Sequence, residues 1–489
     1  MRLVGPFVRL GVVAICTATA VLVATPSAYA NVTLTQASAD PYADAQAQHQ
    51  TQVEPDSFQW GSTIVSAFQT GRVFGGGSSN IGWATSTNGG ATWTRGFLPG
   101  ITPNGSPAGG YGQASGPSVA FDLKHNVWLI SSLGLTSSTA DVLTSRSTDN
   151  GLTWSTPIRT AFGDLLDKPG IACDNNAASP FFGNCYVTYD IVNGNILRMK
   201  TSKDGGLTWG PGMSTGDGAS GIGGQPVVLN NGTVLVPYFD TFFGDMGSFR
   251  SVDGGASWRA TVQVDAVFHD TPAGGLREFP MPVAERDGPG TVYLVWSDCG
   301  FRANCAVNDI VMAKSTSETT WGPTTRVPID PVTSNVDHFL PGISVDLTSG
   351  STSARIGITY YYYSNGSCTA ATCQLNVGFI SSTNGGSTWS APVQIAGPMT
   401  LSWLPNTNQG RMVGDRISTS IPFGGNAYPV IPVASAPVGS SFRMSMQVPT
   451  GGLPITGGSV AAELRTATAG SASGFSEQSS SAPGQLNLH

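Results

Sequence analysis

The sequence predicts an all-β protein that folds as a single β-propeller of four-stranded antiparallel blades, and three observations carry that prediction. The 489 residues include 63 glycines and 32 prolines, about a fifth of the chain, which is typical of turn-dense β proteins and argues against a helical bundle. A short motif ending in tryptophan recurs at intervals of roughly 50–70 residues. An X-Pro step followed by an apolar strand precedes most copies, and this combination is typical of propeller blades.

The recurring motif predicts a tight turn. Asp or Asn at its third position accepts backbone N–H bonds within the turn, and the glycine supplies a positive φ. We expect each copy to join the third and fourth strands of a blade on the bottom face, with its Trp packed under the sheet, so the motif is structural. The copies are STNGGATW (86–93), STDNGLTW (147–154), SKDGGLTW (202–209), SVDGGASW (251–258), STNGGSTW (382–389) and a degenerate STSETTW (315–321).

The X-Pro steps predict where each blade begins. They are Glu54-Pro55, Gly116-Pro117, Lys168-Pro169, Gln225-Pro226, Phe279-Pro280 and Leu340-Pro341, and a last unit without the motif starts near 414–416. Seven blades are favoured, within residues 53–450. Six is the alternative if the last unit only completes an earlier blade.

The two ends differ from the repeats. Residues 1–30 combine Arg2 and Arg9 with an apolar run over 10–24 and a small-x-small site ending at Ala30, which predicts a signal peptide. Residues 31–52 form a polar lead-in able to lend a strand to close the ring, and the Gly/Ser-rich residues 451–489 are expected to be a disordered tail. We therefore expect a secreted, extracellular monomer with no membrane span once the signal is cleaved.

The cysteines agree with export. Cys16 lies in the signal, and the other six form three close pairs, for which local disulfides are the simplest expectation in an oxidising compartment. A zinc site is the weaker alternative, because there is no CxxC and no histidine at ligand spacing. The expected bridges are Cys173–Cys185, Cys299–Cys305 and Cys368–Cys373.

Charge excludes some function classes. With 23 Lys and Arg against 30 Asp and Glu, the chain offers no basic stripe for nucleic acid. No glycine-rich phosphate loop lies between a strand and a helix, so no nucleotide cofactor is expected. We expect no cofactor at all, with a structural calcium at an acidic rim left open although no EF-hand loop is present.

Propeller topology places the scarce charges at one mouth. The start of each first strand and the end of each second strand lie on the top face. First-strand starts carry Glu54, Asp167 with Lys168, Arg277 with Glu278, Asp337 with His338, and Asp415 with Arg416; second-strand ends carry Arg72, Asp190, Asp240, Asp298 and Tyr362. The alternative interpretation is that these acids only cap strand ends and solvate the channel rim.

The repeats resemble the Asp-boxes of the sialidase superfamily over most of residues 53–448. The resemblance implies an exported retaining exo-glycosidase acting on terminal acidic sugars, with sialic acid as the leading case. In that family three arginines hold the substrate carboxylate, a tyrosine activated by glutamate is the nucleophile, and an aspartate is the acid/base. Carried over, this implies Arg72, Arg277 and Arg416 as the clamp, Tyr362 as nucleophile, Glu278 as its activator and Asp167 or Glu54 as acid/base, with Glu54, Asp298, Asp337 and His338 lining the substrate site. The segment TGRVF (70–74) supplies the arginine of the family's Arg-Ile-Pro signature but lacks its Ile-Pro.

Two other functions fit the same mouth. The first is a non-catalytic propeller that binds a glycan or a protein. The second is a polysaccharide lyase, in which His338 and a tyrosine would take a proton beside the carboxylate of an acidic sugar. Converging arginines favour the glycosidase, scattered rim charges favour the binding module, and a His–Tyr pair facing one arginine favours the lyase.

Overall fold

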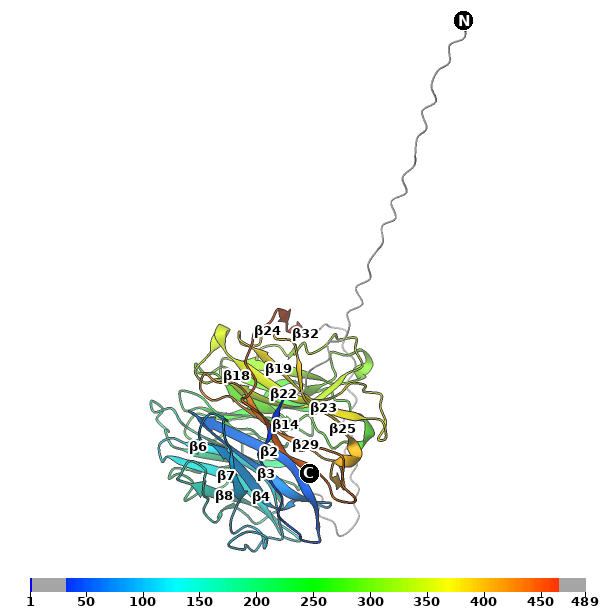
Figure 1. The fold of residues 1–489 in the computed structure, drawn as a ribbon. Coiled ribbons are helices and arrows are strands. Elements are labelled where there is room, and N and C mark those ends of the chain that lie inside the picture. The colour runs from blue at the N-terminus through cyan, green and yellow to red at the C-terminus, as the bar shows by residue number, and fades with distance from the viewer. Residues whose placement is uncertain (2–31, 466–489) are drawn as a thin grey trace.

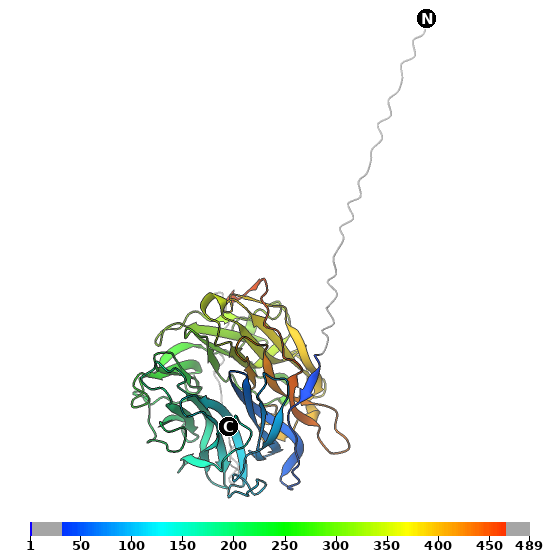
Figure 2. The same ribbon diagram turned by 60° about the vertical axis from the view of Figure 1, so that its left-hand side comes forward.

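The computed structural model describes Met1 and residues 32–465, so the predicted signal peptide, Met1 apart, lies outside the described residues. These residues form β-strands and four 3₁₀ turns, Ala273–Gly275, Ala303–Cys305, Ser351–Ser353 and Leu401–Trp403. Figure 1 shows the strands grouped in small sheets, and Figure 2 shows these sheets following the chain around a ring until the last meets the first. The predicted all-β propeller is confirmed at this level.

Five separate antiparallel sheets hold three to five strands each. They are β10 (Leu166–Cys173), β11 (Cys185–Ile191) and β12 (Ile196–Ser202); β13 (Val227–Val228), β14 (Val234–Asp240), β15 (Asp245–Ser251) and β16 (Val262–Ala266); β17 (Val283–Arg286), β18 (Val292–Asp298), β19 (Asp309–Ser315), β20 (Thr325–Arg326) and β32 (Glu463–Leu464); β21 (Asp337–Val345), β22 (Ile356–Tyr363), β23 (Gln374–Ser382) and β25 (Val393–Thr400); and β28 (Ser418–Ser420), β29 (Tyr428–Ala434), β30 (Met444–Pro449) and β1 (Leu34–Gln36).

A sixth sheet has eight strands and contains two consecutive meanders. They are β2 (Ala47–Trp60), β3 (Thr63–Val73), β4 (Ser78–Ser86) and β5 (Thr94–Phe97), then β6 (Gln113–Asp122), β7 (Val127–Leu135), β8 (Ala140–Ser147) and β9 (Ile158–Ala161). A single pair, Ser78 opposite Ala114, joins the two meanders. Because this contact merges two units into one sheet, the count of seven blades stays a prediction.

Both ends of the described chain are paired into the sheets. The lead-in strand β1 pairs with β30, so the last sheet takes its outer strand from the N-terminal side. Near the C-terminal end, β31 (Val460–Ala461) pairs with β24 (Thr388–Trp389), and β32 pairs with β20. The predicted disordered tail is therefore wrong over 451–465, where backbone pairing with two blades orders the segment; residues 466–489 lie outside the described part. The folded region also begins earlier than residue 53, since β2 starts at Ala47.

Four of the six X-Pro steps lie inside the first strands instead of opening them, whereas Gln225-Pro226 and Phe279-Pro280 precede β13 and β17 as expected. In β2, β6, β10 and β21 the pairing shifts register across this step. The residue before proline takes a positive φ at Glu54 (56°), Gly116 (51°), Lys168 (48°) and Leu340 (50°). Such bulges redirect side chains out of the normal alternation. The bulges therefore determine which side chains face the channel.

The repeated motif forms the expected turn between third and fourth strands. In the copy at 147–154, Ser147 Oγ donates to Asp149 Oδ1 at 2.8 Å, and the Thr153 N–H donates to the same oxygen at 2.9 Å. The Gly151 N–H donates to Ser147 Oγ at 2.9 Å. Equivalent bonds recur in the copies at 202, 251 and 382. The Trp is fully buried at Trp389 and half-buried at Trp154.

All three predicted disulfides form. Their Cα–Cα separations are 4.0 Å for Cys173–Cys185, 4.7 Å for Cys299–Cys305 and 4.9 Å for Cys368–Cys373. Cys173–Cys185 joins two consecutive strands of one sheet, and each of the other two bridges lies within the segment between two consecutive strands.

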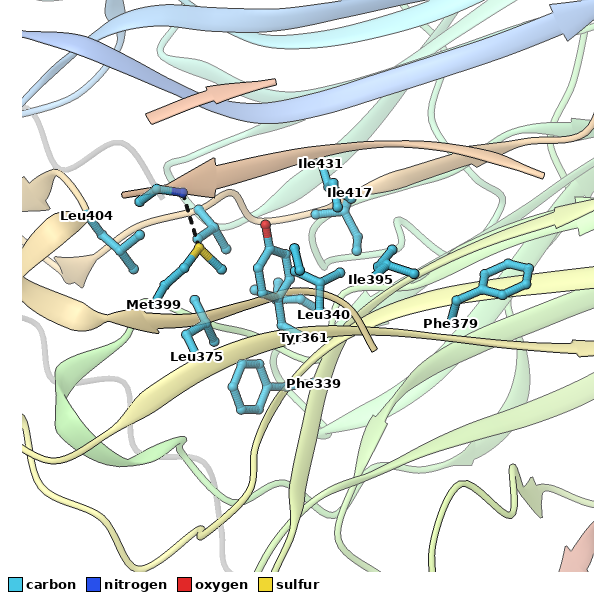
Figure 3. Packing of buried hydrophobic residues seen from close by; sticks show 14 of the residues in the cluster. Phe339, Leu340, Tyr361, Leu375, Phe379, Ile395, Met399, Leu404, Ile417 and Ile431 are labelled. Carbon is cyan, nitrogen blue, oxygen red and sulfur yellow. Dashed lines mark hydrogen bonds between the residues drawn. The ribbon is translucent and has the colours of Figure 1, made fainter. Parts of the chain in front are cut away.

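The largest apolar cluster packs β21–β25 against the last sheet (Figure 3). Tyr361 lies in it and donates its hydroxyl to the Pro432 carbonyl oxygen of β29 at 2.6 Å. Tyr363 belongs to the same cluster, whereas Tyr360 and Tyr362 contact a different cluster on the other face of β22. The four consecutive tyrosines are thus divided between two faces by strand alternation.

Candidate functional site

Eight of the charged residues that the sequence places at one mouth come together. Two backbone contacts assemble them, because the segment before β28 runs between β2 and the segment before β17. The Glu54 N–H donates to the Val413 carbonyl at 2.8 Å, and the Arg277 N–H donates to the Arg411 carbonyl at 2.7 Å. Side chains from four sheets therefore meet at one place, which we name the channel cluster: Glu54, Arg72, Asp167, Lys168, Asp190, Arg277, Asp415 and Arg416.

Asp415 lies at the centre of the channel cluster. It accepts bidentate bonds from Arg277 Nε and Nη2, both at 2.6 Å, and a third bond from Lys168 Nζ at 2.8 Å. All three side chains are at most 5% exposed. Burial acts to raise the pKa of Asp415, but the two cations outweigh it and hold that pKa well below its usual range. Asp415 is therefore a buried counter-ion that keeps Arg277 and Lys168 in place.

Arg72 and Arg416 lie beside this ion pair. Arg72 is buried and donates from Nη1 to the Gly77 carbonyl at 2.5 Å, while Arg416 is half-buried and donates to Gln225 Oε1 at 3.4 Å. Burial and the nearby Arg277 lower the pKa of Arg72 to about 10. The pKa values of all three arginines are influenced by the same two acids, Glu54 and Asp415.

The three arginines predicted to hold the substrate carboxylate thus lie close together, but some of their nitrogens already donate hydrogen bonds to protein groups. Arg277 has two of its three nitrogens bound to Asp415. Its Nη1 is a buried donor with no hydrogen-bond partner among the described residues. A buried charged donor without an acceptor is costly. This nitrogen is a charged donor whose hydrogen-bonding capacity the described residues leave unused.

Glu54 has the properties of an acid/base group. Burial and the negative charge of Asp415 raise its pKa to about 7, against the opposing effect of Lys168 and Arg277. Gln69 Nε2 donates to its Oε2. Glu54 and Lys168 both hold positive φ values as non-glycine residues, and strained backbone of this kind is often found at functional sites.

Asp167, the other predicted acid/base, is already bound on both oxygens. Its Oδ1 accepts the Lys168 N–H at 2.8 Å, and its Oδ2 accepts Lys168 Nζ at 3.1 Å. It lies directly opposite Asp190 in the β10–β11 pair. Burial and the charge of Asp167 raise the pKa of Asp190 well above its usual value. Of the two predicted groups, Glu54 is the one suited to donate a proton near neutral pH.

A second group of titratable side chains adjoins the channel cluster, and we name it the Glu278 cluster: His269, Asp270, Glu278, Asp337 and Tyr363. Glu278 is buried between His269 Nε2, at 2.5 Å from its Oε2, and Ser297 Oγ, which donates to Oε1 at 2.6 Å. Burial lowers the pKa of His269, but Glu278 outweighs this effect and the pKa is raised overall. Burial and the charge of Glu278 also raise the pKa of Asp337 to about 7.

Tyr363 lies on the other face of β22 from Tyr362, and the charge of Glu278 acts on its hydroxyl. Its hydroxyl is buried and has no hydrogen-bond partner among the described residues. Burial raises its pKa, and Asp337 and Glu278 raise it further. Tyr363 packs in the same apolar cluster as Val53, Leu276 and Val413, which flank the channel residues Glu54, Arg277 and Asp415. The two clusters are neighbours because Arg277 of one and Glu278 of the other are consecutive in the chain.

The predicted pairing of Tyr362 with Glu278 does not fit this geometry. Tyr362 lies on the opposite face of β22, where it lines a cavity of about 240 Å³ together with His338 and Tyr360. Its ring centre is 6.1 Å from that of His338. The physical reason is strand alternation, which places neighbouring side chains on opposite faces of a strand. The prediction was one residue off in the register of β22.

His338 is not at the mouth either. It is buried beside an ion network in which Arg302 and Arg326 bind Asp309 and Asp330 at 2.9 Å or less. Asp309, Asp330 and His338 are the one group within residues 32–465 whose ligand atoms are close enough for a metal ion. Because two arginines already balance these carboxylates, the site does not fit the calcium that the sequence left open.

Asp298, which was predicted to line the substrate site, is held by groups of the protein. It is fully buried and accepts the N–H groups of Phe268 at 3.0 Å and Gly300 at 2.7 Å. Arg465 Nη2 donates to it at 3.0 Å. Burial nevertheless raises the pKa of Asp298 to about 6.

Some residues of the two clusters were missed as site residues by sequence reasoning. Lys168, Asp190 and Asp415 each stand at a first-strand start or second-strand end, so their positions already pointed to the channel. His269 and Tyr363 gave no such signal, because His269 lies in a loop and Tyr363 in a run of four tyrosines.

Comparison with known proteins shows the fold alone. No family model matches the chain, and no curated protein matches it. Among solved structures, a polysaccharide lyase (ulvan lyase) is 11% identical with a TM-score of 0.50, covering 83% of this chain and 96% of its own. A Hadza microbial sialidase is 13% identical with a TM-score of 0.45, covering 76% and 73%. An α-L-arabinofuranosidase from Fusarium graminearum is 14% identical with a TM-score of 0.44, covering 72% and 97%.

No helix within the described residues is long and apolar enough to span a bilayer.

Proposed function

We propose that this protein is an exported, carbohydrate-active propeller that hydrolyses a glycoside carrying an anionic group. The observation that carries the proposal is the buried, unpartnered Nη1 of Arg277 within a group of four cations, Arg72, Lys168, Arg277 and Arg416. A carboxylate placed there would accept a charge-assisted bond that the protein leaves unmade. Three disulfides fit an oxidising extracellular compartment, and we retain the monomer as part of the proposal.

The proposed chemistry uses Tyr363 and Glu278 from the Glu278 cluster and Glu54 from the channel cluster. Tyr363 replaces Tyr362 as the nucleophile in this proposal. Its hydroxyl has no hydrogen-bond partner among the described residues, so Glu278 has to turn from Ser297 toward it. Glu278 then takes the phenol proton while the tyrosine oxygen forms a bond to the anomeric carbon. The bond from that carbon to the leaving oxygen breaks, and Glu54 supplies the proton to the leaving group. Water then hydrolyses the tyrosyl sugar, with Glu54 taking a proton from the water and Glu278 returning one to Tyr363. The pKa of about 7 allows Glu54 to act in both directions.

The sugar specificity is proposed from the resemblance and not from the fold match. Sialic acid stays the leading case, since its carboxylate would fit a cluster with three arginines. A uronic acid is the second case, because its carboxylate makes the same contact.

A polysaccharide lyase is the second candidate function, and the observation that favours it is the buried His269–Glu278 pair, at 2.5 Å, beside Tyr363. His269 replaces His338 in this hypothesis, because His338 lies in the ion network. A lyase would leave an unsaturated product that absorbs ultraviolet light, whereas a hydrolase would leave a new reducing end and no such absorbance.

The test is a screen of the purified mature chain against 4-methylumbelliferyl glycosides, including the sialoside and uronides, together with acidic polysaccharides. Tyr363→Phe should abolish turnover, while the matched control Tyr362→Phe, one residue away on the other face, should retain it. Arg416→Gln should raise KM by about tenfold to a hundredfold with little change in kcat, because it removes a charge-assisted contact of roughly 1.5–3 kcal/mol. Equal turnover in the two tyrosine variants would refute the nucleophile assignment. Glycan binding without turnover of any substrate would identify the protein as a binding propeller.

A further inference from the structure

A pair of exposed phenylalanines marks a second surface away from the channel cluster. Phe242 and Phe243 lie in the turn between β14 and β15 and are 79% and 73% exposed. Their ring centres are 4.8 Å apart with planes at 90°. Burying such side chains against a ligand is favourable, and exposed apolar groups of this kind commonly mark binding sites. Because they follow the second strand of their sheet, they lie on the same face of the propeller as the channel cluster.

The turn that carries the pair is held by hydrogen bonds. Asp240 Oδ1 accepts the N–H of Phe242 at 2.9 Å and that of Phe243 at 3.0 Å. The Gly244 N–H donates to the Asp240 carbonyl at 2.9 Å, and the Gly244 carbonyl accepts the N–H of Val267 at 3.0 Å. The two rings are therefore presented by an organised turn, which reduces the entropy lost on binding.

Beside the rings is a hollow of about 670 Å³, a size typical of small-ligand sites. Its lining includes Asp217, Asp240 and Asp245 and the amide of Gln263, and it contains no Lys, Arg or His. Asp245 Oδ2 accepts Gln263 Nε2 at 2.8 Å, and Asp217 Oδ2 accepts the Thr261 N–H at 2.8 Å. The hollow thus offers fixed hydrogen-bond acceptors next to two aromatic faces.

We propose that the Phe242–Phe243 pair and this hollow form a binding subsite for neutral sugar residues. The C–H faces of a sugar ring pack on the negative faces of aromatic rings, and sugar hydroxyls donate to carboxylates. Three carboxylates with no cation in the lining repel an anionic ligand, so this subsite favours a neutral sugar over the anionic ligand proposed for the channel cluster. An anionic lipid surface or a nucleic acid is disfavoured for the same reason.

Native gel electrophoresis of the full mature chain in gels containing a polysaccharide tests this subsite. The neutral probes are arabinan, galactan and galactomannan, and polygalacturonate is the anionic probe. We expect at least one neutral probe to retard the protein, and Phe242→Ala/Phe243→Ala to weaken that retardation by about tenfold in Kd. Phe423→Ala, an exposed phenylalanine at the opposite end of the sheets, is the control and should bind as the parent does.

Three outcomes would overturn the subsite: no retardation by any neutral probe, equal retardation of the double variant and the parent, or retardation by polygalacturonate alone. Turnover of small anionic substrates should be unchanged in the double variant. A failure of the subsite therefore leaves the proposed channel activity untouched, and failure of that activity leaves this binding measurement intact.

Discussion

Replacing Asp415 by asparagine tests whether the channel cluster depends on one buried counter-ion. The change keeps the side-chain shape but removes the charge that faces Arg277 and Lys168. In the parent, Asp415 accepts three charge-assisted bonds of 2.6, 2.6 and 2.8 Å, and it is 1% exposed. Removing one partner of a buried ion pair costs about 3–5 kcal/mol, because the remaining charges stay buried and uncompensated. We therefore expect the free energy of unfolding to fall by about that amount at pH 7.

The measurement is equilibrium denaturation in guanidinium chloride, followed by tryptophan fluorescence. Asp164→Asn is the matched control, since Asp164 is an exposed acid, and it should change stability by no more than about 0.5 kcal/mol. Adding Lys168→Met to Asp415→Asn should cost less than the two single changes together, because the second change removes a charge that the first left unpaired.

The pH dependence of the stability difference between the parent and Asp415→Asn is a second test of the counter-ion role. The folded state lowers the pKa of Asp415, so its stabilising contribution is present above the unfolded-state pKa, about 4, and is lost as pH falls through the folded-state value. The difference between parent and Asp415→Asn should therefore be full at pH 7 and shrink in acid. A loss of under about 1 kcal/mol at pH 7, or a difference that grows in acid, would refute the counter-ion role.

Three further predictions concern stability. Folding raises the pKa of Glu54 to about 7, so its protonated form stabilises the fold at low pH and this contribution is lost as pH rises through 7; Glu54→Gln should raise the melting temperature at pH 8 but not at pH 4. Asp149→Ala should cost about 1–3 kcal/mol by removing the acceptor of the turn, whereas Asp149→Asn should cost less because Asn88 and Asn384 occupy this position in other copies; equal losses in denaturation would contradict this. Trp389→Ala should lower the free energy of unfolding by about 3–5 kcal/mol, and Trp93→Ala should lower it less because Trp93 is half-buried. Calorimetry measures both losses, and a larger loss for Trp93→Ala would contradict a structural role of the buried Trp.

Local features of the sequence were sufficient for the architecture. The repeated turn motif needs only its own Ser, Asp or Asn, Gly and Thr to form its hydrogen bonds, so its structure follows from eight residues. The cysteine pairs are five to twelve residues apart and each closes a short loop. Because the starts of first strands and the ends of second strands share one face of a propeller, the order of strands along the chain was also enough to bring Glu54, Arg72, Arg277 and Asp415 to one mouth.

The sequence could not determine which side chains contact one another inside that mouth. The β-bulges set which side chains face the channel, and a shift of one residue exchanges Tyr362 for Tyr363 beside Glu278. His338 was expected at the rim, but a network of Arg302, Arg326, Asp309 and Asp330 from a neighbouring sheet surrounds it. The order of residues 451–465 likewise depends on pairing with strands more than 70 residues earlier. The sequence thus determined the repeats and the location of the charges, because these depend on local turns and chain order. Tertiary structure alone decided strand register and the partner of each buried charge, because both depend on contacts between distant segments.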